Sequence, residues 1–456
     1  MTIRELIQKS SVYIVSQIGH SKTLSRKIMW LSILTTVIMI CCYQIYAFFD
    51  QYFKYPVVVN LKIEGQDAVD FPAVTVCNLN RMKSEYEKCL YDNSTVSNCM
   101  YFEVGKDMGS FALPERRSIH ACETKFKGKY RKNTDAAIEF LQNYSNLDHT
   151  KRELFGHQYS DMIKACLFNW MPCSFKLDPV LCFQYGNCFT FKAKAPYIQK
   201  PWKVTSAGPR GALELILDVK PDEYVPISHT TGIRIVIHNP NDTPDPETNG
   251  VNIFPGYETH ISLSQSVIRR LPAPYKDECI SYAGNPLLQS QAQCMQDCVQ
   301  EYKLQEVRLR GTVIAYKINM RQCTVTNTTE LCCLDAVIND LAIHGADCKC
   351  PFPCLTTYYN ERLAVAKWPS KAFFLKGMYN SIAEDIKAFR KTHAKVKIFF
   401  STLERIAYVQ KPVFLESEVF SHLGGELSLW LGLSIIAIFE LIEALLHFIT
   451  DKSRFL

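Results

Sequence analysis

The residues best suited to do chemistry lie in an apolar stretch from Val419 to Thr450. Five ionisable side chains interrupt it: His422, Glu426, Glu440, Glu443 and His447. A carboxylate at the centre of a bilayer is costly unless it faces water or a partner group. Rings of glutamate attract cations and repel anions. These acids therefore predict a water-filled path for cations.

A helix through this stretch would place most of these side chains on one stripe. Heptad spacing defines its members, which are His422, Glu426, Leu429, Leu433, Ile436, Glu440 and Glu443. Small residues allow neighbouring helices to approach closely or the helix to break; they are Gly424, Gly425, Gly432 and Ser434. One helix cannot enclose water, so the stripe predicts several copies around an axis. The alternative is that Glu426 and Glu443, near the two ends, reach the membrane interfaces.

A second apolar stretch, Trp30 to Phe49, is uncharged over about 20 residues, enough to cross a hydrocarbon core of roughly 30 Å. A cleaved signal peptide is the rival interpretation, but 29 residues precede the stretch and no small-residue cleavage site follows. The preceding flank is basic, which favours a cytoplasmic location. We therefore expect cytoplasmic ends at 1–29 and 451–456, spans at 30–49 and 419–450, an extracellular segment at 50–418, and a plasma-membrane location.

Cysteine usage supports this topology. Of 19 cysteines, two lie in the first span and 17 between positions 77 and 354, which is typical of an oxidising compartment. The C-x3-C at 294–298 and the C-x-C-x3-C at 348–354 could bind zinc, but the spacing and compartment favour disulfides. Four acceptors for N-glycosylation lie in the same segment: Asn93, Asn143, Asn241 and Asn327.

The extracellular segment has the pattern of an α+β fold. Strands are expected at 55–63, 73–77, 213–219 and 232–238, where β-branched residues alternate. Helical periodicity is present at 291–305 and 370–391. In the second of these, one apolar face is expected to contain Phe373, Phe374, Met378, Ile382, Ile386 and Phe389. The mean hydropathy of -0.06 over 456 residues excludes a protein with many spans. No basic cluster suited to nucleic acid and no enzyme motif is present, so we expect neither activity.

Several motifs together resemble the degenerin, epithelial sodium channel and acid-sensing ion channel superfamily. They are FPAVTVCNLNR at 71–81, GHQYSDM at 156–162, YGNCFTF at 185–191, RLPAPY at 270–275 and LGGELSLWLGLSIIAIFELIE at 423–443. The resemblance covers nearly the whole chain. It implies a homo- or heterotrimer of related subunits, each with two spans and a domain of palm, β-ball, knuckle, finger and thumb, the thumb at about 275–360. It also implies an amiloride-sensitive sodium channel without a cofactor.

The resemblance assigns pore residues. The selectivity motif falls on Gly432, Leu433 and Ser434, where the leucine departs from the small residue common in relatives. Glu440 and Glu443 match the acidic pair below the constriction. Ser421 matches the position at which bulky substitutions hold degenerins open. Glu426 stands where glutamine is common, so an acidic ring there would bind calcium, as a blocking or permeating ion.

The resemblance also implies a coupling joint between Tyr55 and Tyr275 and five disulfides. These are Cys77–Cys188, Cys166–Cys173, Cys279–Cys354, Cys294–Cys350 and Cys298–Cys348. Seven cysteines receive no partner: Cys89, Cys99, Cys122, Cys182, Cys323, Cys332 and Cys333. The His-Gly pair of the family's N-terminus falls on Tyr13 and Ile14, and neither residue matches. This departure predicts a low open probability or a need for a partner subunit.

The opening stimulus is the least determined property. Acid-sensing relatives carry paired histidines where this chain has Tyr55-Pro56, which argues against strong proton gating. We expect an extracellular ligand such as a neuropeptide, with proton, constitutive or mechanical opening as alternatives. A non-conducting modulatory subunit is a further alternative, and a trimeric ATP-gated receptor a remote one. We also expect the two spans to contact membrane lipid.

Overall fold

The fold is that of a computed structural model. It describes residues 12–90, 140–173 except 142, 177–192, 202–282 except 241, 290–307, 341–375 except 346, and 385–443 except 435, 438 and 441. The chain divides into two compact units. The helical unit comprises Met1–Asn60, Arg270–Cys279 and Val409–Leu456, and the sheet unit comprises Leu61–Arg269 and Ile280–Tyr408.

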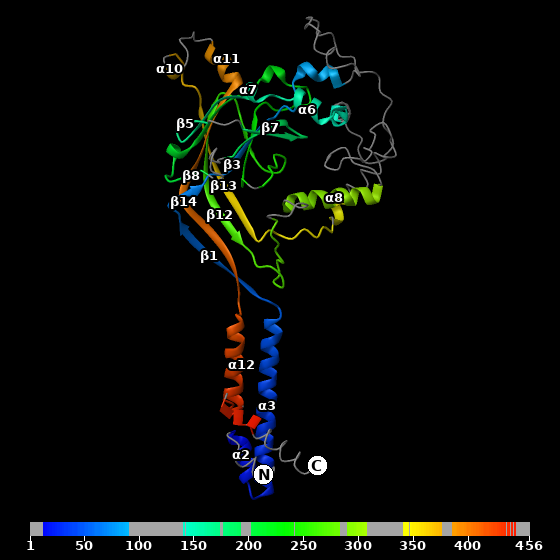
Figure 1. The fold of residues 1–456 in the computed structure, drawn as a ribbon, viewed down its shortest axis with the longest axis vertical. Coiled ribbons are helices and arrows are strands. Elements are labelled where there is room, and N and C mark those ends of the chain that lie inside the picture. The colour runs from blue at the N-terminus through cyan, green and yellow to red at the C-terminus, as the bar shows by residue number, and fades with distance from the viewer. Residues whose placement is uncertain are drawn as a thin grey trace. The chain divides into compact units, whose positions relative to one another are not determined.

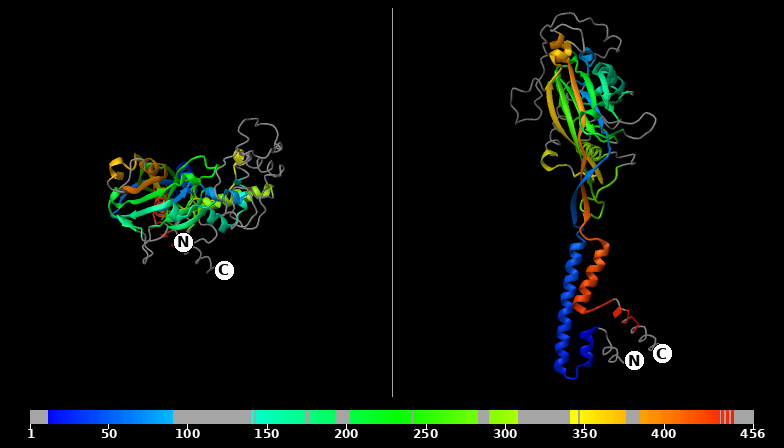
Figure 2. Two further views of the ribbon diagram at one scale, coloured as in Figure 1. Left: turned by 90° about the horizontal axis from the view of Figure 1, so that it is seen from above. Right: turned by 90° about the vertical axis from the view of Figure 1, so that its left-hand side faces the viewer.

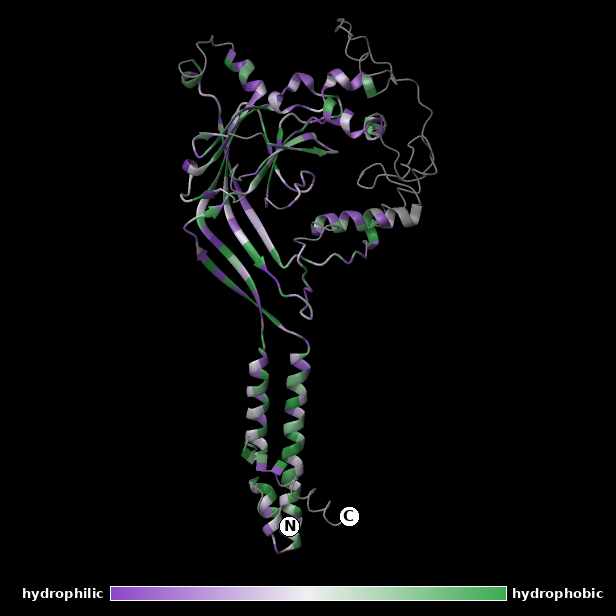
Figure 3. Cartoon of the chain, viewed as in Figure 1, coloured by the Kyte–Doolittle hydropathy of each residue, from purple (hydrophilic) through white to green (hydrophobic). Residues whose placement is uncertain are grey.

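The described part of the helical unit contains α2 (Tyr13–His20), α3 (Leu24–Tyr52) and α12 (Glu416–Leu431). Within this unit α3 and α12 lie side by side (Figures 1 and 2). Among the described residues, α3 alone is both long and apolar enough to cross a membrane (Figure 3). It contains the predicted span 30–49 and extends beyond it at both ends.

The larger sheet has the order β13-β12-β14-β9-β4-β5, with β1 beside β14. Long strands form one side of it: β12 (Tyr257–Arg269), β13 (Leu355–Lys367) and β14 (His393–Pro412). The others are β1 (Val57–Gly65), β4 (Ile163–Phe168), β5 (Met171–Pro172) and β9 (Leu213–Asp218). Every pairing with a recorded register is antiparallel.

The smaller sheet has the order β11-β10-β3-β7-β6. Its strands are β3 (Ala73–Asn78), β6 (Asp178–Cys182), β7 (Gly186–Phe191), β10 (Ile233–His238) and β11 (Val251–Ile253). A separate pair joins β2 (Val69–Asp70) to β8 (Lys203–Val204).

Short helices connect these strands. They are α6 (His149–Phe155), α7 (Tyr159–Met162), α8 (Gln291–Val307), α10 (Lys371–Phe373) and α11 (Asp385–Thr392). Three 3-10 turns lie at Ser84–Leu90, Pro209–Gly211 and Pro221–Glu223.

One hydrophobic core takes side chains from both sheets. In β9, Leu213, Leu215 and Leu217 are fully buried, while the intervening residues are partly exposed. This alternation follows from the two-residue period of a strand. All six residues of β3 are buried, because both of its faces are covered. Burying one such leucine contributes about 1.5–3 kcal/mol, so these strands form a stable frame.

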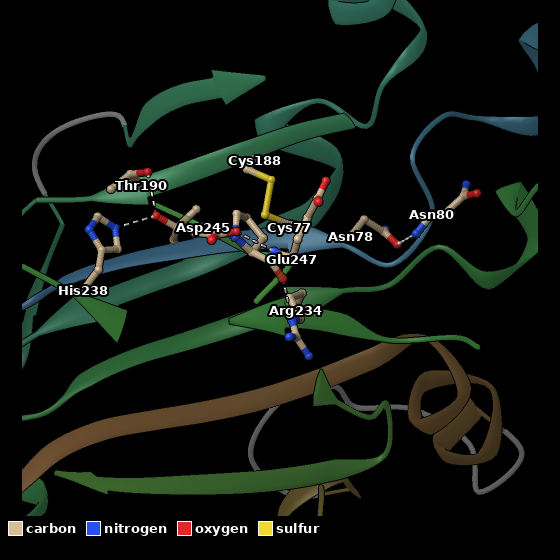
Figure 4. The surroundings of a disulfide bond; sticks show 11 residues. Cys77, Asn78, Asn80, Cys188, Thr190, Arg234, His238, Asp245 and Glu247 are labelled. Atoms are coloured by element: carbon tan, nitrogen blue, oxygen red, sulfur yellow. Dashed lines mark hydrogen bonds between the residues drawn. A yellow bond between two sulfur atoms is a disulfide. The ribbon is translucent and has the colours of Figure 1, made fainter. Parts of the chain in front are cut away.

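Disulfides fasten the frame at the places that the resemblance implies. Four are Cys77–Cys188, Cys166–Cys173, Cys294–Cys350 and Cys298–Cys348, and Cys279 and Cys354 are also disulfide-bonded. The zinc alternative at 294–298 is therefore wrong. Figure 4 shows Cys77–Cys188 joining directly opposed residues of β3 and β7, with Thr190 and His238 nearby. In the same place Thr75 Oγ1 lies 2.8 Å from Thr190 Oγ1 and 2.9 Å from His238 Nε2.

The four predicted strands correspond to β1, β3, β9 and β10, and the helix predicted at 291–305 corresponds to α8. The helix expected over 370–391 is present at its two ends, as α10 and α11, and residues 376–384 lie outside the described part. Phe374 and Ile386 are buried as expected, but Phe373 is 51% exposed. The single apolar face expected there is therefore only partly correct.

Candidate functional site

The stretch predicted as the second span contains a break. Helix α12 ends at Leu431, and Gly432 adopts the left-handed conformation with φ 62°. Glycine accepts this conformation because it has no Cβ. Ser434 Oγ accepts a hydrogen bond of 3.1 Å from the Ala437 N–H, where a helical turn follows. A single continuous helix over 419–450 is therefore excluded, and the break expected as an alternative at the small residues is confirmed.

Several of the predicted pore residues are exposed in the isolated chain. Leu429 and Ile436 are 75% and 71% exposed. Ser421, Ser434, Glu440 and Glu443 are exposed as well, and Leu433 is half-buried. The residues around and beyond the break thus present carboxylates, hydroxyls and backbone to their surroundings. Their roles as pore residues remain predictions.

His422 and Glu426 lie differently from the rest of the stripe, because they face α3. The imidazole of His422 stacks on Phe48, with ring centroids 4.2 Å apart. Glu426 Oε2 accepts a hydrogen bond of 3.0 Å from Trp430 Nε1, and its Oε1 lies 3.9 Å from His422 Nδ1. Trp430 Nε1 also donates to Gln44 Oε1 at 2.5 Å. Heptad spacing alone could not reveal these partners.

The structure brings Tyr55 and Tyr275 together in the helical unit. Their rings meet edge to face, with centroids 5.7 Å apart. The loop that carries Tyr275 is fixed to Gln410, which accepts from the Leu271 N–H at 3.0 Å and donates to Asp277 Oδ2 at 2.6 Å. The contact expected between the two tyrosines is therefore present, and its role in coupling remains a prediction.

The residues in place of the family's His-Gly begin helix α2. The ring of Tyr13 meets Trp30 of α3 edge to face, with centroids 6.1 Å apart. An aromatic contact thus ties α2 to α3 where the family has a histidine.

Other predicted residues are only partly described. Asn143 is half-buried, whereas Asn93, Asn241 and Asn327 lie outside the described part, as do Cys99, Cys122, Cys323, Cys332 and Cys333. Cys182 has a free, partly buried thiol. Cys89 is described and partly buried, and its partner is not assigned.

The sequence did not predict a buried polar cluster of His157, Asn80 and Glu223, although His157 lies in the GHQYSDM motif. His157 is 1% exposed, and its Nε2 lies 3.0 Å from Asn80 Nδ2. Its Nδ1 is 3.6 Å from Glu223 Oε2, beyond hydrogen-bond distance. Burial lowers the pKa of His157 to about 4 and raises the pKa of Glu223. The histidine is therefore neutral at neutral pH.

Comparison with known proteins identifies the class. The family described as "Amiloride-sensitive sodium channel" matches residues 6–444. The chain therefore belongs to this family, which comprises ion channels and not enzymes. The family expected from the motifs is confirmed.

Individual relatives share about a quarter of their residues with this chain. Acid-sensing ion channel 1 of Gallus gallus is 26% identical, over 97% of this chain and 83% of the relative. Degenerin-like protein asic-2 of Caenorhabditis elegans is 23% identical, over 95% of this chain and 84% of the relative. Degenerin mec-4 of Caenorhabditis briggsae is 29% identical, over 66% of this chain and 39% of the relative.

Among solved structures, a proton-activated chloride channel aligns over 91% of this chain and 96% of its own, with 7% identity and a TM-score of 0.32. This similarity is too low to bear on fold or function.

The buried histidine generates a prediction about stability in acid. An unfolded histidine binds a proton below about pH 6.5, whereas folded His157 does so only near pH 4. The contribution of neutral His157 to the free energy of unfolding is therefore complete above about pH 6.5. It decreases by about 3 kcal/mol as the pH falls toward 4. The raised pKa of Glu223 acts in the opposite direction. Thermal unfolding of the purified protein between pH 7.5 and 4.5 measures the net effect.

The substitution His157→Gln should flatten this pH dependence, because glutamine does not titrate. His229→Gln is the matched control, since His229 is exposed. An equal acid sensitivity of the wild type and His157→Gln would contradict the prediction.

Proposed function

We propose that this chain is one subunit of a trimeric, amiloride-sensitive, sodium-permeable channel of the plasma membrane. Each subunit would cross the membrane twice, through α3 and through the stretch 419–450, with both ends of the chain in the cytoplasm. The observation that carries the proposal is the break of α12 at Gly432, followed by the exposed carboxylates Glu440 and Glu443. Membership of the sodium channel family supports it.

The free-energy cost of carboxylates and non-helical backbone in lipid supports this proposal. Ionised side chains and unpaired backbone within a bilayer must be buried in protein or face water. One helix pair cannot enclose water, so several copies must surround the path. Gly424 and Gly425 have open space where a Cβ would stand, which allows helices of neighbouring copies to approach closely.

Selectivity is assigned to the non-helical residues Gly432, Leu433 and Ser434. Backbone carbonyls that leave a helix can replace the water shell of a cation. Glu440 and Glu443 would concentrate cations beside them, and Ser421 would face the same path at the other side of the break. No cofactor is required, because sodium itself is the substrate.

Opening is assigned to an extracellular ligand, for which an amidated neuropeptide is the first candidate. Tyr55 and Tyr275 would pass the movement to α3, which ends at Tyr52. Proton gating is the second candidate. Two observations favour it: the buried His157, which becomes charged only in acid, and the similarity to acid-sensing relatives.

Expression of this chain alone, with current recording, tests the proposal. We expect an inward current, blocked by amiloride and abolished by replacing sodium with a large organic cation, when amidated peptides or acid are applied. Glu440→Gln should lower the unitary conductance about twofold or more, because one charge per subunit is removed. Glu404→Gln, an exposed acid of β14, serves as the control.

The outcome that contradicts the channel proposal is a chain present at the cell surface without current under any stimulus. Current restored by a co-expressed relative would assign the chain to a heteromeric or modulatory subunit. Current evoked only by ATP would assign it to the ATP-gated class.

The tyrosine contact generates a separate prediction. An aromatic pair is worth about 0.5–1.5 kcal/mol beyond its buried area, which corresponds to about a 2- to 12-fold change in an equilibrium. Tyr275→Ala should therefore change the ratio of open to closed channels by that factor. Tyr275→Phe should preserve it, because the ring remains. Open probability from single-channel records, with surface protein quantified, measures both, and equal behaviour of the two variants would refute the coupling role.

A further inference from the structure

A tryptophan near the end of helix α12 forms a hydrogen bond to α3. The Trp430 indole N–H points at two acceptors, Gln44 Oε1 of α3 at 2.5 Å and Glu426 Oε2 of α12 at 3.0 Å. An indole nitrogen is a donor only, and in an apolar setting it needs an acceptor. We call these three residues, Gln44, Glu426 and Trp430, the Trp430 latch.

The latch belongs to a continuous contact between the two helices. On α12, His422, Glu426 and Trp430 follow at intervals of four residues, which places them on one face. On α3, Gln44 and Phe48 have the same spacing, and Phe48 is 6% exposed beneath the stacked ring of His422. The side chain of Glu426 is 18% exposed. Its carboxylate is thus held inside its own subunit.

The latch lies directly before the break. Trp430 precedes the left-handed Gly432 by two residues, and Leu431 is the last residue of the helix. The backbone that follows, Gly432 to Ser434, is not helical, but the Gly432 and Leu433 N–H groups still donate to the Ser428 and Leu427 carbonyls of α12, at 3.0 and 3.3 Å. Its position depends on where the end of α12 is held. Trp430 supplies that support from α3.

We propose that the Trp430 latch positions the Gly432–Ser434 segment, and that Glu426 acts as a hydrogen-bond acceptor within its own chain. This inference rests on the proposed channel function. It differs from an acidic ring at Glu426, in which the charge would face the ion path. A charge in the path acts through its charge, whereas the latch needs only an acceptor oxygen.

Substitutions at the acceptor separate the two roles. Glu426→Gln keeps an acceptor oxygen and removes the charge, whereas Glu426→Leu removes both. The latch predicts that Glu426→Gln retains the sodium-to-potassium permeability ratio and the calcium sensitivity of the wild type within about twofold. Glu426→Leu, Trp430→Phe and Gln44→Leu should each lower the permeability ratio severalfold. Reversal potentials in mixed sodium and potassium solutions measure the ratio.

Two controls complete the design. Gln51→Leu changes an exposed glutamine of the same helix and should leave the ratio unchanged. The double variant Glu426→Leu with Trp430→Phe should be no worse than either single variant, because both remove the same hydrogen bond.

Three results would overturn the latch. One is a loss of calcium sensitivity or conductance in Glu426→Gln as large as that in Glu426→Leu, which would place the charge in the ion path. Another is a wild-type ratio in Trp430→Phe. The third is strict additivity in the double variant.

The latch is also testable if the wild type carries no current and the channel proposal itself fails. Thermal unfolding of the purified variants should then show non-additive losses for Glu426→Leu and Trp430→Phe. Additive losses would refute the latch independently of conduction.

Discussion

The rest of the account depends on how backbone groups are satisfied around Gly432. A helix satisfies its own N–H and C=O groups, which is why helices cross lipid. Here the helix stops, and the amide of Gly432 still finds the carbonyl of Ser428 at 3.0 Å. The last carbonyls of α12 lack the N–H donors that a following helical turn would provide. Within an apolar stretch, such a segment requires protein or water around it, and the proposed sodium path would supply both.

Short connections join α3 and α12 to two strands of the larger sheet. β1 begins at Val57, shortly after α3 ends at Tyr52, and α12 begins at Glu416, shortly after β14 ends at Pro412. The two connections meet where the Val413 N–H donates to the Pro56 carbonyl at 2.9 Å. The strands on the far side of these two connections, β1 and β14, also pair with each other.

Much of this arrangement could be predicted from the sequence because it follows local rules. Alternating apolar residues located β9 and β10, and the small residues Gly432 and Ser434 indicated the break, whereas Gly424 and Gly425 lie within the unbroken α12. The disulfide pairs followed from resemblance, since spacing alone leaves many pairings open. The orientation of Glu426 could not be predicted, because it is set by Gln44 and Trp430, and Gln44 lies hundreds of positions away in the chain. His157 was missed because a buried histidine is defined by the side chains that surround it.

The central claim is that the break at Gly432 lies on the ion path. Ser434→Cys tests it most directly, with a positively charged methanethiosulfonate reagent applied during current recording. The reagent should block current through this variant while leaving the wild type, with its native Cys41 and Cys42, unaffected. Modification of the introduced thiol is verified chemically. If the current is then undiminished, Ser434 does not lie on the ion path.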